Sequence, residues 1–341
     1  MGTPPLSREL AAQAVQAMNQ AVRIGKSYKF AGELIGLPES TIYKRIQAAK
    51  FRYGIEVDAL PPDVAPVPEL SATPTVRQTV RVKAWRVAND DPVYKVVAVG
   101  DAHDSPALPD KSRFKWIARY AADVKPDQLV QIGDFGSFDS LSRHDAPGSL
   151  SQKLRPSFAR DMESLEEALA AIHGVIGTDI PLHVTLGNHE ARVQRFESNT
   201  AEIEGALWQP LLDLFARYGW RTHDEGLFHF VGGVGFVHAP RTLMGREYGG
   251  KTLNAVANDA MFSIVFGHSH RMQVLSVPKI GPLAGVDIIN LGTCMPTNHV
   301  EHYARVSTTG WTYGVMLLTI QGGRVIGHEF TSIDDLSRRY G

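Results

Sequence analysis

Five segments of the chain carry side chains that could bind a metal ion directly after an apolar run typical of a buried strand. The apolar runs cover residues 96–99, 129–132, 183–186, 234–237 and 263–266. Loops that leave strands carry most active-site residues, so the side chains that follow these runs are expected to meet at one edge of the fold. The candidate ligands are Asp101, His103, Asp134, Asn188, His238, His268 and His270.

These donors are oxygen and imidazole nitrogen, without thiolates, which favours a catalytic site for divalent ions over a structural zinc site. Mn²⁺ is the expected ion, and Fe, Zn and Ni are alternatives. Asp101 and His103 can reach one point only where the strand breaks into a turn, and the same holds for His268 and His270. The donors are too many for one ion. Two ions that share Asp134 would use them all, and such pairs catalyse phosphoryl displacement.

The motifs Asp-x-His, Gly-Asp, Gly-Asn-His-Glu, a lone His and Gly-His-x-His occur in this order over roughly residues 93–320. This order resembles the signature of the calcineurin-like metallophosphoesterases. The resemblance implies an α/β fold, a four-layer α/β/β/α sandwich of two mixed sheets between helices. It also implies a leaving-group role for His189, with one ion held by Asp101, His103, Asp134 and His270 and a second held by Asp134, Asn188, His238 and His268.

The sequence departs from the protein Ser/Thr phosphatases of this superfamily. Those enzymes have an Asp three residues after their Gly-Asp motif, where it orients the catalytic His, and an Arg before Gly-Asn-His-Glu. Here the next acid after Asp134 is Asp139, and Leu186 precedes the second motif, so protein phosphatase activity is not expected. Asp139 could still orient His189 or could be a helix N-cap. Arg192 could bind a phosphate oxygen or form a surface salt bridge.

The composition fits an enzyme with an additional domain. The chain has 341 residues, of which 43% are hydrophobic and 21% charged, so it can bury a large core and form two domains. It has no apolar stretch of about 18 residues and no signal peptide, so we expect a cytoplasmic protein without a membrane partner. The single cysteine, Cys294, excludes an internal disulfide and is expected to be a packing residue. Surface or packing roles are also expected for His144, His173, His183, His223, His229, His299, His302 and His328.

Residues 1–58 are predicted to form a small all-α domain. Residues 1–60 hold eight Lys/Arg against five Asp/Glu, while the remainder holds 27 against 31, and this basic excess points to a polyanionic partner. Helical patterns over 6–23, over 27–35 and from Glu39 onward resemble a helix-turn-helix of the repressor, resolvase and transposase type. In that resemblance a small core contains Leu34, Leu37, Ile42 and Ile46, and DNA would contact Ser40, Thr41, Tyr43, Lys44 and Arg45. A helical unit for oligomerisation is the alternative.

A Pro-rich linker is predicted over residues 59–78, with five prolines among residues 59–74. The metallophosphoesterase domain would then span 79–341. It should begin with a strand over 79–87 and contain helices over 111–123, 157–176, 201–218 and 249–258. Later strands over 286–290, 313–320 and 324–330 are expected to complete the second sheet.

The sequence favours a metal-dependent phosphodiesterase or nuclease that acts on DNA. A DNA-reading head raises the effective concentration of a tethered enzyme on nucleic acid. The alternative is a small-molecule phosphomonoesterase or cyclic-nucleotide phosphodiesterase whose head serves oligomerisation or regulation. A DNA-binding regulator with an inactive enzyme domain is disfavoured, because every expected ligand is present.

Overall fold

The computed structural model describes residues 6–24, 26–58, 91–143, 145–248, 253–280, 285–297, 299 and 310–341. Contacts divide the chain into two units, Met1–Val82 and Lys83–Gly341. The linker expected over 59–78 and the strand expected over 79–87 lie outside the described residues. The domain bounds 1–58 and 79–341 therefore stay predictions. In the described part of the chain, no helix combines the length and the apolar content needed to span a bilayer.

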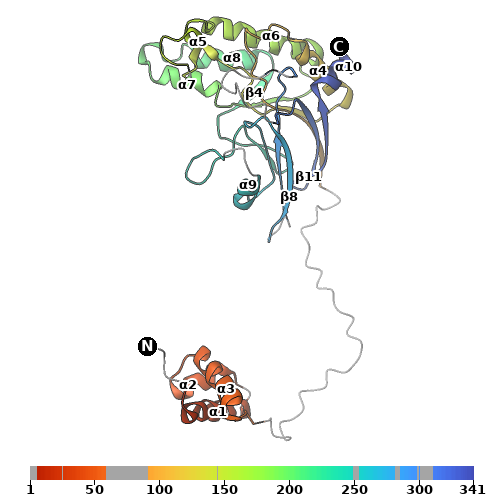
Figure 1. The fold of residues 1–341 in the computed structure, drawn as a ribbon. Helices are drawn as coiled ribbons and strands as arrows, with labels where there is room; N and C mark the ends of the chain where they lie inside the picture. The colour runs from red at the N-terminus through yellow and green to blue at the C-terminus, as the bar shows by residue number, and fades with distance from the viewer. Residues whose placement is uncertain are drawn as a thin grey trace. The chain divides into compact units, whose positions relative to one another are not determined.

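The smaller unit contains three helices, α1 (Arg8–Arg23), α2 (Tyr28–Ile35) and α3 (Glu39–Tyr53) (Figure 1). Gly36 ends α2 in the left-handed conformation, with φ of 67°. Gly32 permits the tight turn between α2 and α3. Any residue with a Cβ at this position would place that atom 2.3 Å from the carbonyl oxygen of Leu37. The three helices enclose a core of small side chains from α1 together with Ile42 and Ile46.

The expectation that Leu34 belongs to this core is wrong, since it is 42% exposed. Ala31 and Gly32 are the buried residues of α2, and Ile35 also packs on the core. At 100° per residue, Leu34 points roughly 100° away from the middle of that face. Leu37 packs against the core, as expected.

The larger unit contains two sheets (Figure 1). The strands of the first, in spatial order, are β11 (Arg324–Ser332), β10 (Gly314–Gln321), β1 (Val93–Val99), β2 (Gln128–Gln131), β3 (Leu182–Thr185) and β4 (Trp220–His223). The strands of the second are β5 (His229–Val231), β6 (Val234–Phe236), β7 (Ile264–Phe266), β9 (Gly285–Leu291) and β8 (Met272–Pro278).

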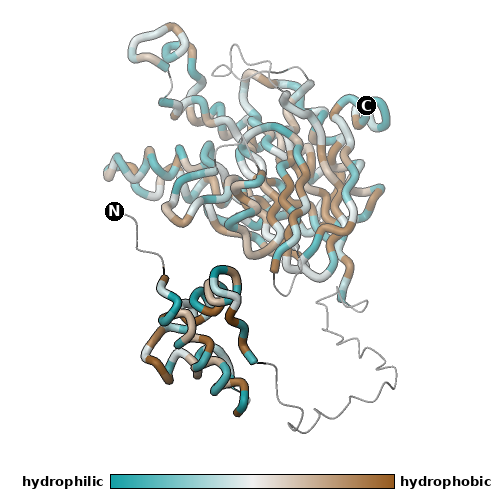
Figure 2. Tube along the Cα trace, turned by 60° about the horizontal axis from the view of Figure 1, so that its bottom comes forward, coloured by the Kyte–Doolittle hydropathy of each residue, from teal (hydrophilic) through white to brown (hydrophobic). Residues whose placement is uncertain are grey.

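Helices cover the outer faces of both sheets, and alternate side chains of one strand face different layers. Val97 and Val99 of β1 pack in one core with helices of the first layer, whereas Val96 and Ala98 face the second sheet in another. The central strands are therefore apolar on both faces (Figure 2). The first helical layer contains α4 (Ser112–Val124), α6 (Phe158–Ile176), α8 (Trp208–Arg217) and α10 (Ile333–Tyr340), and α9 (Leu253–Asp259) packs on the second sheet. This confirms the α/β/β/α sandwich.

The helix expected over 201–218 is only partly correct. The chain forms a short 3-10 helix, η2 (Ala201–Ile203), and α8 begins only at Trp208. Gly205 interrupts the segment with φ of 78°. The carboxylate of Glu197, at the end of α7 (Glu190–Ser198), then accepts the N–H groups of Gly205, Leu207 and Trp208 at 2.6–2.8 Å. This cap replaces the missing helical bonds at the start of α8.

The expectation that all three late strands complete the second sheet is also wrong. β9 lies in the second sheet, but β10 and β11 extend the first, where β10 pairs antiparallel with β1. Met316, Leu318 and Ile320 of β10 face the space between the sheets, while Val315 packs on the other side. An apolar strand buried on both faces fits either sheet, so its pattern did not distinguish them.

The strand directions determine where the site forms. β1, β2, β3 and β4 are mutually parallel, and so are β6, β7 and β9. Parallel strands present their carboxyl ends at the same edge of a sheet. The loops after β1, β2 and β3 therefore leave one edge of the first sheet, and those after β6 and β7 leave one edge of the second. Candidate ligands from both sets of loops lie close together.

Three histidines, from β3, β4 and β5, stack on one another. The rings of His183 and His229 are 4.0 Å apart and those of His223 and His229 are 4.4 Å apart, with interplanar angles of 14° and 29°. His229 Nε2 lies 2.8 Å from the amide oxygen of Gln128, and His183 Nδ1 lies 3.0 Å from His223 Nε2. One ring nitrogen from each histidine lies within 4.8 Å of the others, a spacing that could also hold a metal ion. The packing role expected for these residues therefore stays a prediction.

The pH dependence of stability tests this packing. Burial and the neighbouring imidazoles lower the pKa of His183 to about 4 and that of His229 to about 3, whereas an unfolded histidine has a pKa near ~6.5. Below that pH the unfolded chain takes up protons that the folded stack does not. Stability is therefore complete above about pH 6.5 and falls as the pH drops toward 4.

We expect His229→Phe to keep a ring in the stack while removing one titrating group. After allowance for its partial exposure, the acid-induced loss of stability should shrink by on the order of 1 kcal/mol between about pH 7 and about pH 5.5. Urea unfolding of the metal-free protein measures this, with the exposed His328→Phe as the control. The same pH dependence in wild type and His229→Phe would contradict the interpretation.

Candidate metal centre

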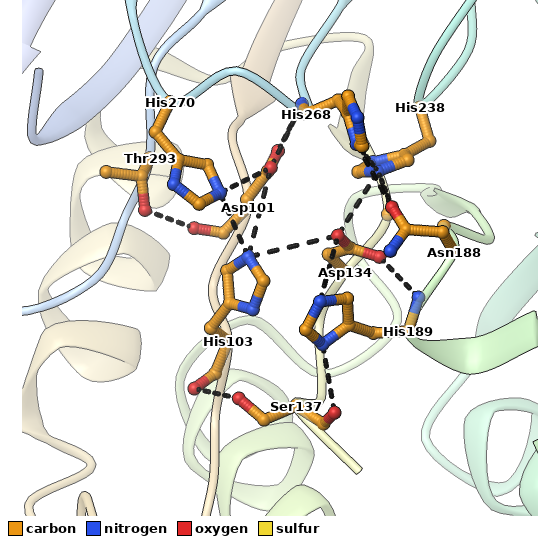
Figure 3. Close-up of polar contacts among 12 residues, drawn as sticks. Asp101, His103, Asp134, Ser137, Asn188, His189, His238, His268, His270 and Thr293 are labelled. Carbon is orange, nitrogen blue, oxygen red and sulfur yellow. Dashed lines mark hydrogen bonds and ion pairs between the residues drawn. The ribbon is translucent and has the colours of Figure 1, made fainter. Parts of the chain in front are cut away.

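Side chains from distant parts of the chain converge at the carboxyl edge of both sheets (Figure 3). The loop after each of the five strands contributes at least one of them. All seven residues predicted as ligands are brought together, and they are Asp101 and His103 after β1, Asp134 after β2, Asn188 after β3, His238 after β6, and His268 and His270 after β7. Most of them are buried, and the side chain of His268 is 33% exposed.

The backbone of the ligand loops is strained. Six described residues other than glycine have positive φ, and four of them are candidate ligands, namely His103 at 44°, Asp134 at 50°, His268 at 70° and His270 at 57°. Residues with a Cβ rarely adopt this conformation, which costs on the order of 1–3 kcal/mol each. The turns expected at Asp-x-His and His-x-His are therefore present, but His268 and His270 point to two different groups of ligands.

One group of donors contains Asp101, His103 and His270. His270 Nε2 lies 3.0 Å from Asp101 Oδ2 and 3.0 Å from His103 Nε2, while His103 Nε2 and Asp101 Oδ2 are 4.0 Å apart. Ligands about 2.1 Å from one ion are separated by about 3 Å at a right angle and by at most about 4.2 Å. The three atoms therefore fit the coordination sphere of a single ion.

A second group contains Asp134, Asn188, His238 and His268. His238 Nε2 lies 3.2 Å from Asp134 Oδ2, 3.0 Å from Asn188 Oδ1 and 3.2 Å from His268 Nδ1. Asp134 Oδ2 is also 3.8 Å from His103 Nε2, which belongs to the first group. The other oxygen, Oδ1, accepts the N–H of His189 at 2.8 Å. Asp134 is thus placed to join the two groups through Oδ2.

The donor chemistry of the second group requires a cation. His238 Nδ1 lies 3.0 Å from the carbonyl oxygen of Ile132 and must donate to it, because a carbonyl only accepts. In neutral His238 the other nitrogen, Nε2, is then a bare acceptor that faces the oxygens of Asp134 and Asn188. Acceptors that face one another in the protein interior are stable only with a proton or a metal ion between them. The residues present therefore fit a divalent ion.

The pKa values describe the same need for positive charge. Burial alone would lower the pKa of His238, but the Asp134 carboxylate raises it to about 10. Burial alone would raise the pKa of Asp134, but the facing imidazoles of His238 and His189 hold it well below its ordinary value. The pKa of His103 lies well below its ordinary value because of burial and the neighbouring His189 and His270. A divalent ion would take the place of the proton on His238.

Glu190 holds the Asp134 loop, a role that the sequence analysis did not assign. Its buried carboxylate accepts the backbone N–H groups of Asp134, Phe135, Gly136 and Gly187 at 2.8–3.0 Å. Burial and the Asp134 carboxylate raise the pKa of Glu190 to about 7, although these N–H groups favour its charged form. The Gly-Asn-His-Glu motif contained this residue, but the motif alone did not indicate four backbone donors.

His189 also lies at the centre, in contact with a backbone carbonyl and an arginine. Its Nδ1 is 2.9 Å from the carbonyl oxygen of Ser137, and its Nε2 is 2.9 Å from Arg192 Nη2 and 3.8 Å from Asp134 Oδ2. Arg192 Nη1 donates to the same Ser137 carbonyl at 3.0 Å. Asp139 begins the 3-10 helix η1 (Asp139–Leu141), and its role toward His189 stays a prediction.

Cys294 is a packing residue. It is fully buried, and its Sγ lies 3.3 Å from the carbonyl oxygen of Gly100. Burial raises the pKa of the thiol to about 12. The thiol therefore stays protonated near neutral pH and is no nucleophile.

The close approach of the β7 loop to Asp101 yields a prediction. A Cβ at Gly267 would lie 2.2 Å from Asp101 Oδ1 and 2.6 Å from Ile132 Cγ2. Gly267→Ala should therefore displace the Asp101 carboxylate and weaken Mn²⁺ binding by about 10–100-fold, as measured by calorimetric titration. Gly174→Ala on α6 is the control, because nothing lies within 4 Å of its added Cβ. Equal Mn²⁺ affinities for the two variants would refute the prediction.

Comparison with known proteins identifies the family. The chain is 25% identical over 229 residues to the Gene 54 protein of Mycobacterium phage L5, covering 63% of this chain and 86% of that protein. It is 24% identical over 235 residues to the Gene 54 protein of Mycobacterium phage D29, with the same coverage. Among solved structures it matches a phosphoesterase from E. coli at 13% identity and a TM-score of 0.29, covering 69% of this chain and 98% of that one. Residues 94–272 match the family described as calcineurin-like phosphoesterase, and the chain belongs to that family.

Proposed function

We propose that this protein is a dinuclear metal-dependent phosphodiesterase that its N-terminal unit directs to DNA. The observation that supports the hydrolase activity is the pair of donor groups that meet at Asp134 Oδ2. The first ion would be held by Asp101, His103, Asp134 and His270, and the second by Asp134, Asn188, His238 and His268. The donors accept Mn²⁺, Fe, Zn or Ni, and Mn²⁺ is the proposed ion.

Two divalent ions at this site would supply an activated water nucleophile and neutralise charge on the phosphoryl oxygens. The protein contributes the geometry. Asp101 accepts the backbone N–H of His268 at 3.0 Å, and Glu190 binds the backbone of Asp134. These bonds hold the loops of both sheets in one arrangement before substrate arrives, which lowers the reorganisation needed during the reaction.

His189 is the proposed general acid. Because its Nδ1 donates to the Ser137 carbonyl, its Nε2 is the atom that can carry a proton toward the leaving oxygen. Arg192 donates to this Nε2 in the structure, so it would have to turn away to let a protonated His189 act. Once turned, its guanidinium could bind a phosphate oxygen, and Asp139 remains the proposed acidic partner of this pair.

The surface of α3 supports a DNA-binding role for the smaller unit. Ser40, Tyr43 and Lys44 are exposed, while Thr41 and Arg45 are partly exposed along the same helix. The tight turn at Gly36 leads directly into α3, the helix that would enter a DNA groove in a helix-turn-helix protein. We therefore propose that Ser40, Thr41, Tyr43, Lys44 and Arg45 contact DNA.

Replacement of His189 tests the proposed proton transfer. His189→Ala should retain bound Mn²⁺ but lower kcat by roughly 10²–10⁴-fold, because a general acid is lost. The loss should be larger for an alkyl phosphodiester than for bis-p-nitrophenyl phosphate, whose leaving group needs no proton. His328→Ala on the exposed face of β11 should behave like wild type. Equal losses for both substrates would show that His189 only positions the substrate.

Charge removal from α3 tests the DNA-directed part of the proposal. Lys44→Ala/Arg45→Ala should weaken binding to duplex DNA and lower the slope of log K against log salt by about two, since each cation releases about one counterion. Cleavage of bis-p-nitrophenyl phosphate should not change. Lys115→Ala/Lys153→Ala removes the same charge from exposed positions of the larger unit and serves as the control. Wild-type protein that neither binds nor cleaves DNA at low salt would instead favour a small-molecule phosphoesterase.

A further inference from the structure

A hairpin follows His238, a candidate ligand of the second ion. It leaves His238 through Pro240 and returns at Tyr248, whose backbone N–H donates to the Pro240 carbonyl at 3.2 Å. Within it Thr242 N–H donates to the Arg246 carbonyl at 2.7 Å. Arg241 and Glu247 form a bridge pair at its base. The hairpin thus holds Glu247 at a fixed place in relation to His238.

Glu247 reaches another candidate ligand of this ion. Its Oε2 lies 3.5 Å from Nε2 of His268, while Nδ1 of the same ring lies 3.0 Å from Asn188 Oδ1 and 3.2 Å from His238 Nε2. The surroundings of His268 therefore favour different forms of its two ring nitrogens. The outer nitrogen faces a carboxylate, which favours an N–H, and the inner nitrogen faces the site, where a ligand needs a lone pair.

We propose that Glu247 is a positioning residue for the second ion. Its carboxylate accepts the Nε2–H of His268, which leaves the Nδ1 lone pair directed at the site and makes the imidazole a stronger ligand. Carboxylates that support metal-binding histidines in this way typically change metal affinity by about 10–100-fold when removed. His238 obtains the same support from a backbone carbonyl, that of Ile132. The inference rests on the proposed pair of ions but not on the identity of the substrate.

A purely structural role for Glu247 can be separated from this one. Arg241 Nη2 lies 3.8 Å from Glu247 Oε1 and 3.0 Å from Glu225 Oε1. If Glu247 only held the hairpin through Arg241, loss of Glu225 would disturb the hairpin at least as much. Glu225→Gln is therefore the matched control, because it removes the nearer partner of Arg241 and leaves the Glu247 carboxylate beside His268.

The experiment is a calorimetric titration of the metal-free full-length protein with Mn²⁺. We expect wild type to bind two ions, and Glu247→Gln to bind one of them about 10–100-fold more weakly while the other is unchanged. In the Co²⁺-loaded protein the visible absorption bands should shift in Glu247→Gln but not in Glu225→Gln. Equal thermal unfolding of the metal-free proteins would show that each variant is folded. Glu247→Asp is a second variant, which keeps the carboxylate charge on a shorter side chain.

Three results would overturn the inference. Two-ion binding by Glu247→Gln with wild-type affinities would overturn it alone and leave the proposed function intact, as would an equal loss in Glu225→Gln. Binding of a single ion by the wild type would overturn both the proposed ion pair and the role of Glu247.

Discussion

The larger unit depends on positive charge at a point where the fold buries carboxylates close to imidazole lone pairs. The side chains of Asp101, Asp134 and His103 are almost completely removed from water, and the bare nitrogen of His238 faces oxygens on two sides. Burying a carboxylate without a partner costs several kcal/mol. The arrangement is therefore favourable when cations occupy the centre. The loops around it direct metal-binding atoms at the centre instead of pairing all of them with hydrogen-bond donors.

The backbone around the site is locally strained so that the candidate ligands can converge on the centre. Four candidate ligands adopt left-handed backbone conformations, and Gly187 and Gly267 permit approaches that a Cβ would obstruct at 2.2 Å from Asp134 and Asp101. Two carboxylates offset part of that cost through backbone bonds. Glu190 accepts four N–H groups around Asp134, and Asp101 accepts the N–H of His268. Each bond to a charged acceptor contributes roughly 1.5–3 kcal/mol, which is comparable to the strain of one such residue.

The sequence predicted the ligand loops because each one follows a short strand that is buried on both faces, and such strands are visible as apolar runs. It also predicted the helix pair around Gly36, where a left-handed turn needs glycine. It did not predict which sheet takes β10, because pairing with β1 joins residues far apart in the chain. The start of α8 was missed because its cap comes from Glu197, on another helix.

Within the site, too, features with a local sequence signal were predicted and features set by distant contacts were not. The seven candidate ligands belong to motifs that can be read locally, and the structure brings all of them together. The supporting contacts do not have local signals. The Ser137 carbonyl beside His189 and the Glu247 carboxylate beside His268 reach the site through the course of a loop and a hairpin.

The most direct measurement of the central claim is the number of ions bound per chain in wild type and in Asp134→Asn, determined by elemental analysis and calorimetric titration with Mn²⁺. The account predicts two ions in wild type and weakened binding of both in Asp134→Asn, because Asp134 Oδ2 faces donors of both groups. At most one ion per wild-type chain at saturating Mn²⁺, or two tightly bound ions with full phosphodiesterase activity in Asp134→Asn, would contradict it.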